Sequence, residues 1–267
     1  MSFYEEISNY YDYIFPIGEE QIDFISKNAG NPPKSLLDIA CGTGSYSIEL
    51  ARQGYYVVAT DIDAEMIRLL EGKISDLAYG DYKIKCMQAG MLDLTEKLHE
   101  KYDLAFCIGN SVVHLDGKDD IQAFFKSVKM LLKEDGCFVL QIINFDRVLS
   151  KGIKELPVIT NKEVGLKFDR YYRLDKEKNK VLFKTILTIN GSNFNGTNSI
   201  NNINTVNSSN SSNIKIENEI PLFPLMSEDA AAMLKEAGFK TVNLFGDFSG
   251  NKYDKDNSYM LVISAFC

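Results

Sequence analysis

The sequence predicts an α/β protein built on an open, mostly parallel β-sheet, and three observations carry this prediction. An apolar run over residues 35–40 predicts a buried strand, and it leads through Gly42 and Gly44 straight into a helical pattern. The next apolar run predicts a second strand, and it ends at Asp61. Strand and helix patterns then alternate as far as residue 143, which is typical of a parallel sheet with crossover helices.

The glycine turn and the acid after the second strand together predict a nucleotide-like ligand. Gly42 and Gly44 can adopt backbone angles that other residues avoid, and they let a ligand approach the main chain. The helix that follows offers the free N–H groups of its first turn. Asp61 can accept hydrogen bonds from both hydroxyls of a ribose, so we expect an adenosine-type ligand.

An NAD-dependent oxidoreductase is one alternative, and the sequence disfavours it. The dinucleotide-binding fingerprint needs a third glycine or alanine where this chain has Ser47. No clear set of proton-relay residues accompanies the glycine turn either.

The remaining elements follow from periodicity and turn residues. Helices are expected over residues 64–77, 119–132 and 228–237, and strands over 83–88, 102–108, 137–143, 164–172, 181–189, 214–220, 240–245 and 259–266. Asp63 is expected to cap the first of these helices and Ser227 the last. The aromatic stretch over residues 4–15 either packs an N-terminal helix onto the sheet or forms a lid whose phenol groups face the ligand.

The domain organisation is expected to be one domain over residues 1–267, with residues 145–220 as an inserted antiparallel β-rich cap. Within the cap, residues 190–213 contain ten asparagines and six serines. Such a stretch has too few apolar side chains to offset the entropy of ordering the chain, so we expect a low-complexity loop there.

The composition and charge of the chain limit which kinds of molecule it is expected to bind. The formal net charge of −8 argues against nucleic acid, because phosphate binding needs a basic surface. Five scattered cysteines and two histidines predict neither a disulfide framework nor a metal site. No apolar run could span a membrane and no signal-peptide pattern is present, so we expect a cytoplasmic protein with a small-molecule partner, and keep a homodimer open.

The residues around the glycine turn are similar to a sequence motif of a known family. The stretch Asp38-Ile39-Ala40-Cys41-Gly42-Thr43-Gly44, with Asp61 after it, resembles the first motif of class I S-adenosylmethionine (SAM) methyltransferases. Residues 107–115, 131–136 and 144–152 resemble segments of glycine N-methyltransferase and its small-molecule relatives. The resemblance implies a Rossmann-like seven-stranded methyltransferase sheet, mostly parallel with an antiparallel last strand, and SAM as methyl donor.

The resemblance also implies a set of cofactor-binding residues. They are Tyr11, Asp38, Ala40, Cys41, Gly42, Gly44, Asp61, Ile62, Met66, Gly90, Met91, Cys107 and Gly109. Met66 would cover the adenine, or else pack in the core. Gly90 stands where the family often has an acid for the adenine amine, so adenine recognition would depend on the backbone near Gly90 and Met91, or on Asp93.

Three further residues are expected near the methyl acceptor, where they would position it for catalysis. These are Asn110, His114 and Asn144. Their alternative role is structural: the two asparagines would close the loops at the strand ends, and the histidine would pack or cap.

The acceptor itself is constrained by one departure from the family. Ile143 stands where glycine N-methyltransferases have an arginine that holds the substrate carboxylate. An isoleucine cannot pair with a carboxylate, so glycine is disfavoured as substrate unless Arg170 or Arg173 substitutes.

The expected function is a SAM-dependent methyl transfer to a small amine or hydroxyl compound, with the cap selecting the acceptor. An amine need only arrive neutral, whereas a hydroxyl requires a base. Two alternatives stay open at this stage: an RNA or protein acceptor, and a SAM-binding regulatory protein without turnover.

Overall fold

The computed structural model describes residues 6–77, 82–190 and 213–267, and the chain divides into two compact units. The larger unit contains residues 17–153 and 222–267. The smaller unit joins residues 1–16 to residues 154–221.

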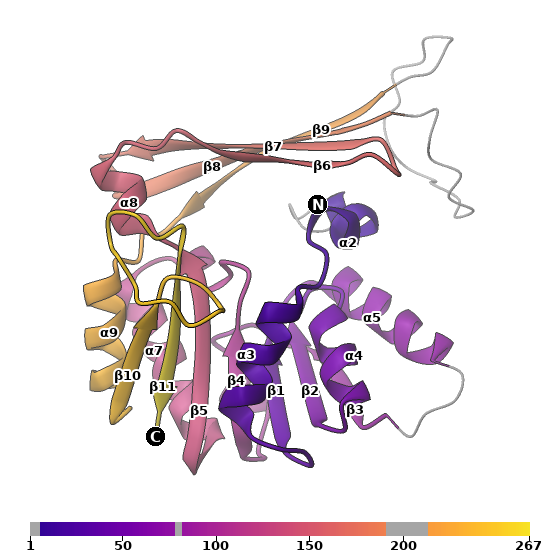
Figure 1. Cartoon of the computed structure of the whole chain (residues 1–267), viewed down its shortest axis with the longest axis vertical. Coiled ribbons are helices and arrows are strands. Elements are labelled where there is room, and N and C mark those ends of the chain that lie inside the picture. Colours follow the sequence, from indigo (N-terminus) through magenta and orange to yellow (C-terminus); the bar gives the residue numbers. More distant parts are fainter. Residues whose placement is uncertain (1–5, 78–81, 191–212) are drawn as a thin grey trace. The chain divides into compact units, whose positions relative to one another are not determined.

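The larger unit is built on a seven-stranded sheet with the strand order β10-β11-β5-β4-β1-β2-β3 (Figure 1). Its strands are β1 (Ser35–Ile39), β2 (Tyr56–Asp61), β3 (Ile84–Gln88), β4 (Tyr102–Cys107), β5 (Leu132–Ile143), β10 (Thr241–Phe245) and β11 (Met260–Phe266). Strand β11 pairs antiparallel with both β5 and β10, whereas the pairs among β1 to β5 are parallel. The predicted mostly parallel sheet with an antiparallel last strand is confirmed.

Helices pack on both faces of this sheet. The helices of this unit are α3 (Glu19–Ala29), α4 (Ser45–Arg52), α5 (Ala64–Asp76), α6 (Leu94–Lys97), η2 (Val112–His114), α7 (Lys118–Leu131), α8 (Phe145–Ser150) and α9 (Ser227–Glu236). In Figure 1, α3 and α4 lie in front of the strands and α7 lies behind them. Apolar residues of α3 and α4, such as Ile25 and Leu50, are fully buried against Leu36 and Phe106 of the central strands. Burial of this apolar stripe explains why short amphipathic helices are stable here.

Helix capping follows the prediction at one helix and departs from it at another. The Asp63 side chain accepts hydrogen bonds from the backbone N–H groups of Glu65 and Met66, so the predicted cap of α5 is confirmed. The predicted cap at Ser227 is wrong, because Ser227 is already the first residue of α9. The backbone N–H of Ser227 instead donates to Asp146 Oδ2 at 3.0 Å, so a carboxylate from α8 binds this helix end.

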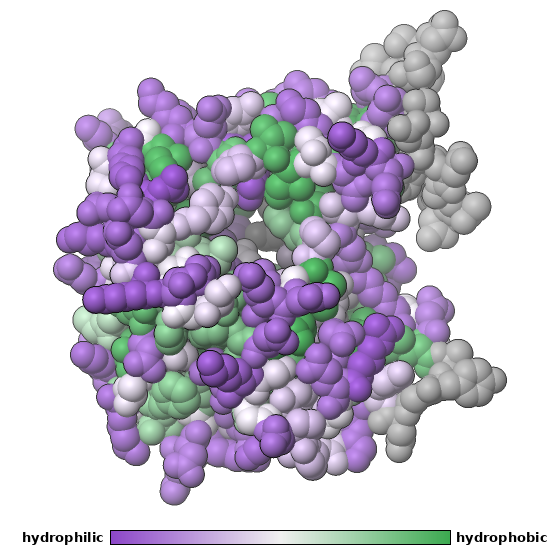
Figure 2. Space-filling view, viewed as in Figure 1, coloured by the Kyte–Doolittle hydropathy of each residue, from purple (hydrophilic) through white to green (hydrophobic). Residues whose placement is uncertain are grey.

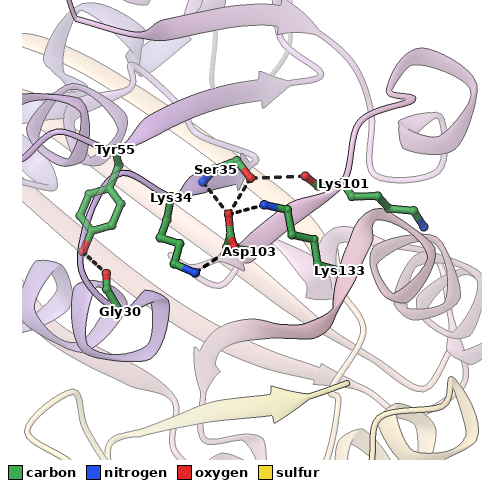
Figure 3. A network of polar contacts seen from close by, with 7 residues as sticks. All are labelled: Gly30, Lys34, Ser35, Tyr55, Lys101, Asp103 and Lys133. Carbon is green, nitrogen blue, oxygen red and sulfur yellow. Dashed lines mark hydrogen bonds and ion pairs between the residues drawn. The ribbon is translucent and has the colours of Figure 1, made fainter.

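A polar network ties three parallel strands together at their amino-terminal ends (Figure 3). Asp103 in β4 accepts hydrogen bonds from the Ser35 backbone N–H and hydroxyl in β1, at 2.8 and 2.9 Å. It also pairs with Lys133 in β5 at 2.7 Å and with Lys34 at 3.3 Å. Burial by itself would raise the pKa of Asp103, but the hydrogen bonds from Lys133, Ser35 and Lys34 outweigh it and lower the pKa.

The smaller unit contains a four-stranded sheet with the order β6-β7-β8-β9. Its strands are β6 (Glu155–Asn161), β7 (Leu166–Asp175), β8 (Lys180–Ile189) and β9 (Ile214–Leu222). The pairs β6–β7 and β7–β8 are antiparallel. Strand β6 was not predicted, because Pro157 argues against a strand; β6 lies at the edge of the sheet, where proline is tolerated.

The N-terminal segment packs on this smaller sheet. Its short helices are η1 (Ser8–Tyr10) and α2 (Tyr11–Ile14). Ile7, Tyr10 and Ile14 are buried together with Phe168 and Leu187. Residues 7–15 therefore pack as the first alternative proposes, but on the smaller sheet; Tyr4 lies outside the described residues, and the lid stays a prediction.

The structure tests the predicted cap and the predicted low-complexity loop only in part. Residues 145–150 form α8, so the smaller sheet begins ten residues after the expected start of the cap. Most of the predicted low-complexity loop, residues 191–212, lies outside the described residues. Within the described residues, no helix is long and apolar enough to cross a membrane, and no group of His, Cys, Asp or Glu is arranged to hold a metal ion.

Candidate active site

The turn after β1 adopts left-handed backbone angles at three alternate residues. The φ angles are 58° at Ala40, 55° at Gly42 and 75° at Gly44. A Cβ atom on Gly44 would lie 2.2 Å from Leu70 Cδ1 of α5, so this glycine is required for packing as well as for its φ. The Cys41 N–H donates to the Thr60 carbonyl at 2.9 Å and holds the turn against β2.

Asp61 at the end of β2 is held against this turn. Its Oδ2 accepts from the Gly42 N–H at 2.8 Å, and its Oδ1 accepts from the Asp63 N–H at 2.9 Å. The residue is 8% exposed, and burial raises its pKa while these two N–H bonds oppose the shift. Each carboxylate oxygen keeps a second acceptor position, so the side chain could still bind two hydroxyl groups.

Asp38 supplies a second buried acid within β1. It is 3% exposed, and its Oδ2 accepts from the Ser47 hydroxyl at 2.6 Å. Burial raises the pKa of Asp38 to about 7; the Ser47 bond opposes the rise and the charge of Asp61 adds to it. Ser47, the residue that breaks the dinucleotide fingerprint, thus serves as the hydrogen-bond partner of an acid.

The predicted adenine residues lie beside these acids. Ile62 is 72% exposed, which is unusual for an isoleucine. A Cβ atom on Gly90 would lie 3.4 Å from Ile62 Cδ1 and 3.1 Å from Asp93 Oδ2, so these three residues are neighbours. Met66 is 1% exposed, which favours its core-packing alternative over contact with adenine.

The two cysteines in the predicted set differ in exposure. Cys107 is fully buried and Cys41 is half-buried. Burial raises the pKa of both thiols, so both are neutral near pH 7 and behave as small apolar side chains.

The ends of β4 and β5 are cross-braced by a residue that was not predicted. Gln141 of β5 accepts the Gly109 N–H on its Oε1 at 2.7 Å, and its carbonyl accepts the Asn110 N–H at 3.2 Å. Asn110 Oδ1 in turn accepts from the Ile143 N–H at 2.9 Å. A polar glutamine inside the apolar run 137–143 was the available signal for this role.

Both polar atoms of the Asn144 side-chain amide form hydrogen bonds within the protein. It is 1% exposed, and its Oδ1 accepts from the Arg147 N–H at 3.0 Å and the Tyr253 hydroxyl at 2.7 Å. Its Nδ2 donates to the carbonyls of Lys255 and Ser258 at 3.0 and 2.9 Å. These contacts favour the loop-closing role of Asn144 over contact with an acceptor.

Tyr253 and Asp146 complete this network and were missed by sequence reasoning. The Tyr253 hydroxyl lies 2.8 Å from Asp146 Oδ2, the same oxygen that accepts the N–H of α9. The network therefore joins the end of β5, the start of α9 and the segment between β10 and β11. No spacing in the sequence connects Tyr253 with Asp146, because more than a hundred residues separate them.

His114 lies in η2, directly after the end of β4. Burial lowers its pKa to about 4, because the charged imidazolium is poorly solvated there. The imidazole is therefore neutral at pH 7 and a weak base.

The structure brings most of the predicted cofactor residues to one edge of one sheet. They follow the carboxyl ends of β1, β2, β3 and β4, where open α/β sheets bind ligands. Tyr11 belongs to the smaller unit, where its ring lies 5.1 Å from that of Phe15. Its contact with a cofactor stays a prediction.

Comparisons with known proteins point to one family. A family model described as a methyltransferase domain matches residues 36–136. The glycine/sarcosine N-methyltransferase of Aphanothece halophytica is 23% identical over 241 residues, which cover 90% of this chain and 79% of the relative. The glycine/sarcosine/dimethylglycine N-methyltransferase of Actinopolyspora halophila is 23% identical over 225 residues, 84% of this chain, but the match spans only 34% of the relative.

The fold of the chain is also similar to that of a solved methyltransferase structure. The crystal structure of an S-adenosylmethionine-dependent methyltransferase from Clostridium acetobutylicum matches this chain with a TM-score of 0.71 at 18% identity, covering 99% of each chain. The matched domain includes the glycine turn, Asp61 and the end of β4. Residues 36–136 therefore match a methyltransferase domain, and the chain as a whole resembles the class I SAM-dependent methyltransferases and, among them, the glycine N-methyltransferase-like enzymes.

Proposed function

We propose that this protein transfers the methyl group of SAM to the nitrogen of a small amine. The observation that carries the proposal is the pairing of the Asp61 carboxylate with the left-handed turn at Gly42. This arrangement leaves acceptor positions for a ribose and a main chain that a ligand can approach closely. SAM itself supplies an activated methyl group on a sulfonium.

The residues around the turn fit an adenosine that carries positive charge. Asp61 would bind the ribose hydroxyls, and the exposed Ile62 beside Gly90 would offer an apolar surface to the adenine. Burial raises the pKa values of Asp38 and Asp61 even though each carboxylate accepts hydrogen bonds, and no cationic group is among the causes that lower either pKa. A cationic ligand would supply one, because an opposite charge nearby stabilises a carboxylate.

An amine acceptor is favoured over a hydroxyl by the chemistry of His114. A hydroxyl acceptor needs a general base whose pKa lies near the working pH. Burial lowers the pKa of His114 to about 4, so this imidazole would be a poor base. An amine that arrives neutral needs no such base and depends on alignment and exclusion of water.

The acceptor need not carry a carboxylate. Ile143 offers no charge, and the two arginines considered as substitutes are engaged within the smaller unit. Arg173 forms an ion pair with Glu219 at 3.1 Å, and Arg170 donates to the Pro157 carbonyl at 2.7 Å. The relatives are N-methyltransferases named for glycine and sarcosine, which supports a small acceptor, and the net charge of −8 disfavours RNA. Cytoplasmic location, homodimeric assembly and the role of residues 145–220 as an acceptor-selecting cap stay predictions.

Thermal unfolding with added SAM, S-adenosylhomocysteine, NAD or NADP tests the donor. A ligand at about a hundred times its Kd stabilises the native state by roughly 2.7 kcal/mol. We expect a shift with the first two ligands, weakened in Asp61→Ala and retained in Glu65→Gln, a neighbouring half-buried carboxylate on α5 that pairs with Arg68. A shift with NAD or NADP alone would overturn the proposal.

Transfer of labelled methyl from SAM to a panel of primary amines and phenols tests the acceptor. We expect turnover with amines, and a rate that rises with pH as the amine loses its proton. His114→Asn should keep more than about a tenth of kcat, because loss of a true general base costs about 10²–10⁴-fold. Turnover of phenols alone, abolished in His114→Asn, would contradict the amine proposal.

A further inference from the structure

A pocket separate from the glycine turn lies on the larger unit, between α3 and the last two strands of the sheet. Its volume is about 630 Å³, which is within the range of small-ligand sites, about 300–1,000 Å³. None of the residues that line it belongs to the glycine turn or to the ends of β1 to β4. Figure 1 shows α3 and the segment between β10 and β11 on the same side of the sheet, and Figure 2 shows hydrophobic surface over β10 and β11 on that side.

The walls of the pocket are aromatic. Phe24 of α3 packs against Phe245 and Phe248, with ring centroids 5.4 and 5.7 Å apart in edge-to-face geometry. Phe266 of β11 adds a fourth ring. Phe245 and Phe266 are only half-buried, so aromatic surface remains available to a ligand. The faces of such rings carry negative charge density and attract cations.

The rim of the pocket is acidic on one side. Glu20 and Asp23 lie three residues apart on α3, both are exposed, and neither has an ion-pair partner within residues 6–77, 82–190 and 213–267. Lys27, one turn further along the helix, also lines the pocket and brings the formal charge of the lining to −1. The polar groups of Asn243 and Ser264, which lie 3.5 Å apart, add hydrogen-bonding capacity beside the rings.

We propose that this pocket binds a small organic cation, such as a quaternary ammonium compound that also carries a hydroxyl. The rings would contact the apolar, positively charged head, and the two carboxylates would select for its charge. The hydroxyl would bind the polar groups of Asn243 or Ser264. A neutral apolar ligand would gain nothing from the carboxylates, and an anion would be repelled by them.

Isothermal titration of the full chain with choline tests the proposal, with saturating S-adenosylhomocysteine present to occupy the methyl-donor site. The matched probe is 3,3-dimethylbutan-1-ol, which has the shape of choline without its charge. We expect saturable binding of choline at millimolar concentration or below, and clearly weaker binding of the neutral alcohol. Equal binding of the two probes, or no saturable binding of choline, would overturn the proposal.

Three variants locate the binding. The double variant Glu20→Gln/Asp23→Asn should weaken choline binding about two- to tenfold, because it removes both charges and little volume. Phe245→Leu should weaken it about two- to fivefold, since it keeps an apolar side chain and loses the ring face. Glu19→Gln, exposed on the same helix and outside the pocket lining, should bind choline like the wild type. Unchanged binding in the first two variants, with unfolding temperatures like the wild type, would place choline elsewhere and refute the pocket.

Discussion

Two residues in the glycine turn share a left-handed backbone but differ in what a side chain would meet. Ala40 already carries a Cβ at φ 58°, at a cost of about 1–2 kcal/mol in conformational energy. Gly44 has a φ of 75° and no room, because its Cβ would overlap Leu70 at 2.2 Å. We therefore expect Gly44→Ala to destabilise the protein by more than about 2 kcal/mol, whereas Ala40→Gly changes stability by less than about 1 kcal/mol.

Urea unfolding of the two variants measures this difference. The thermal shift with S-adenosylhomocysteine should persist in Ala40→Gly, whose turn keeps its backbone path. A Gly44→Ala protein as stable as Ala40→Gly would show that α5 yields to the added methyl group.

Asp38 predicts a dependence of stability on pH. Its pKa is about 7 in the folded chain and about 3.9 when unfolded, so the folded state favours the protonated form. The stability that this group contributes is present below pH 4 and is lost as the pH rises through 7. Asp38→Asn removes this pH dependence. From pH 5 to pH 8 the wild type should therefore lose up to about 3 kcal/mol more of its free energy of unfolding than Asp38→Asn does.

Urea unfolding of the ligand-free protein at the two pH values tests this prediction. Asp76→Asn, an exposed carboxylate near the end of α5, is the control and should follow the wild type. A gap between Asp38→Asn and the wild type that does not change with pH would contradict the prediction.

At the scale of elements, one tyrosine joins three parts of the larger unit. The Tyr253 hydroxyl reaches Asn144 at 2.7 Å and Asp146 at 2.8 Å, and these residues hold the end of β5 and the start of α9. Tyr253→Phe removes the hydroxyl donor that lies beside the buried amide oxygen of Asn144 and the carboxylate of Asp146. We expect a loss of about 1–3 kcal/mol in the free energy of unfolding.

A matched tyrosine serves as control for this change. Tyr56 on β2 is 40% exposed, and its hydroxyl accepts from Lys83 at the surface. Tyr56→Phe should alter stability by less than about 0.5 kcal/mol. Hydrogen exchange in residues 246–259 should accelerate in Tyr253→Phe alone; equal exchange in both variants would refute the joining role.

At the scale of the whole molecule, residues 7–14 pack against strands that lie about 150 residues later in the sequence. Ile14 is 1% exposed and belongs to the cluster that contains Phe168 and Leu187. Ile14→Ala should therefore cost about 2–5 kcal/mol within the smaller unit. Hydrogen exchange should accelerate in β7 and β8 and stay unchanged in β1 and β4.

Tyr13 provides the contrast for this prediction. It neighbours Ile14 but is 41% exposed, so Tyr13→Ala should leave exchange in β7 and β8 close to that of the wild type. Faster exchange across the larger unit in Ile14→Ala would show that the two units do not unfold separately.

Sequence reasoning succeeded where the information is local. The buried strands, the amphipathic helices and the Asp63 cap each depend on residues within one or two turns of each other. The glycine turn and Asp61 were also found this way, because their positions at two successive strand ends imply proximity in a parallel sheet. It failed at β6, where a proline in an edge strand hides the pattern, and at Ser227, where a distant carboxylate binds the helix end.

By itself, the sequence determined the α/β class, the bounds of most of the predicted strands and helices to within a few residues, and the glycine turn with its neighbouring acid. Only the tertiary structure decided that Gln141 braces β4 and β5, that Tyr253 joins Asn144 to Asp146, and that the N-terminal aromatics pack on the smaller sheet. The physical reason is the range of each interaction. Periodicity and capping act between neighbours in the chain, whereas burial, shifted pKa values and long-range hydrogen bonds depend on which distant segments the fold brings together.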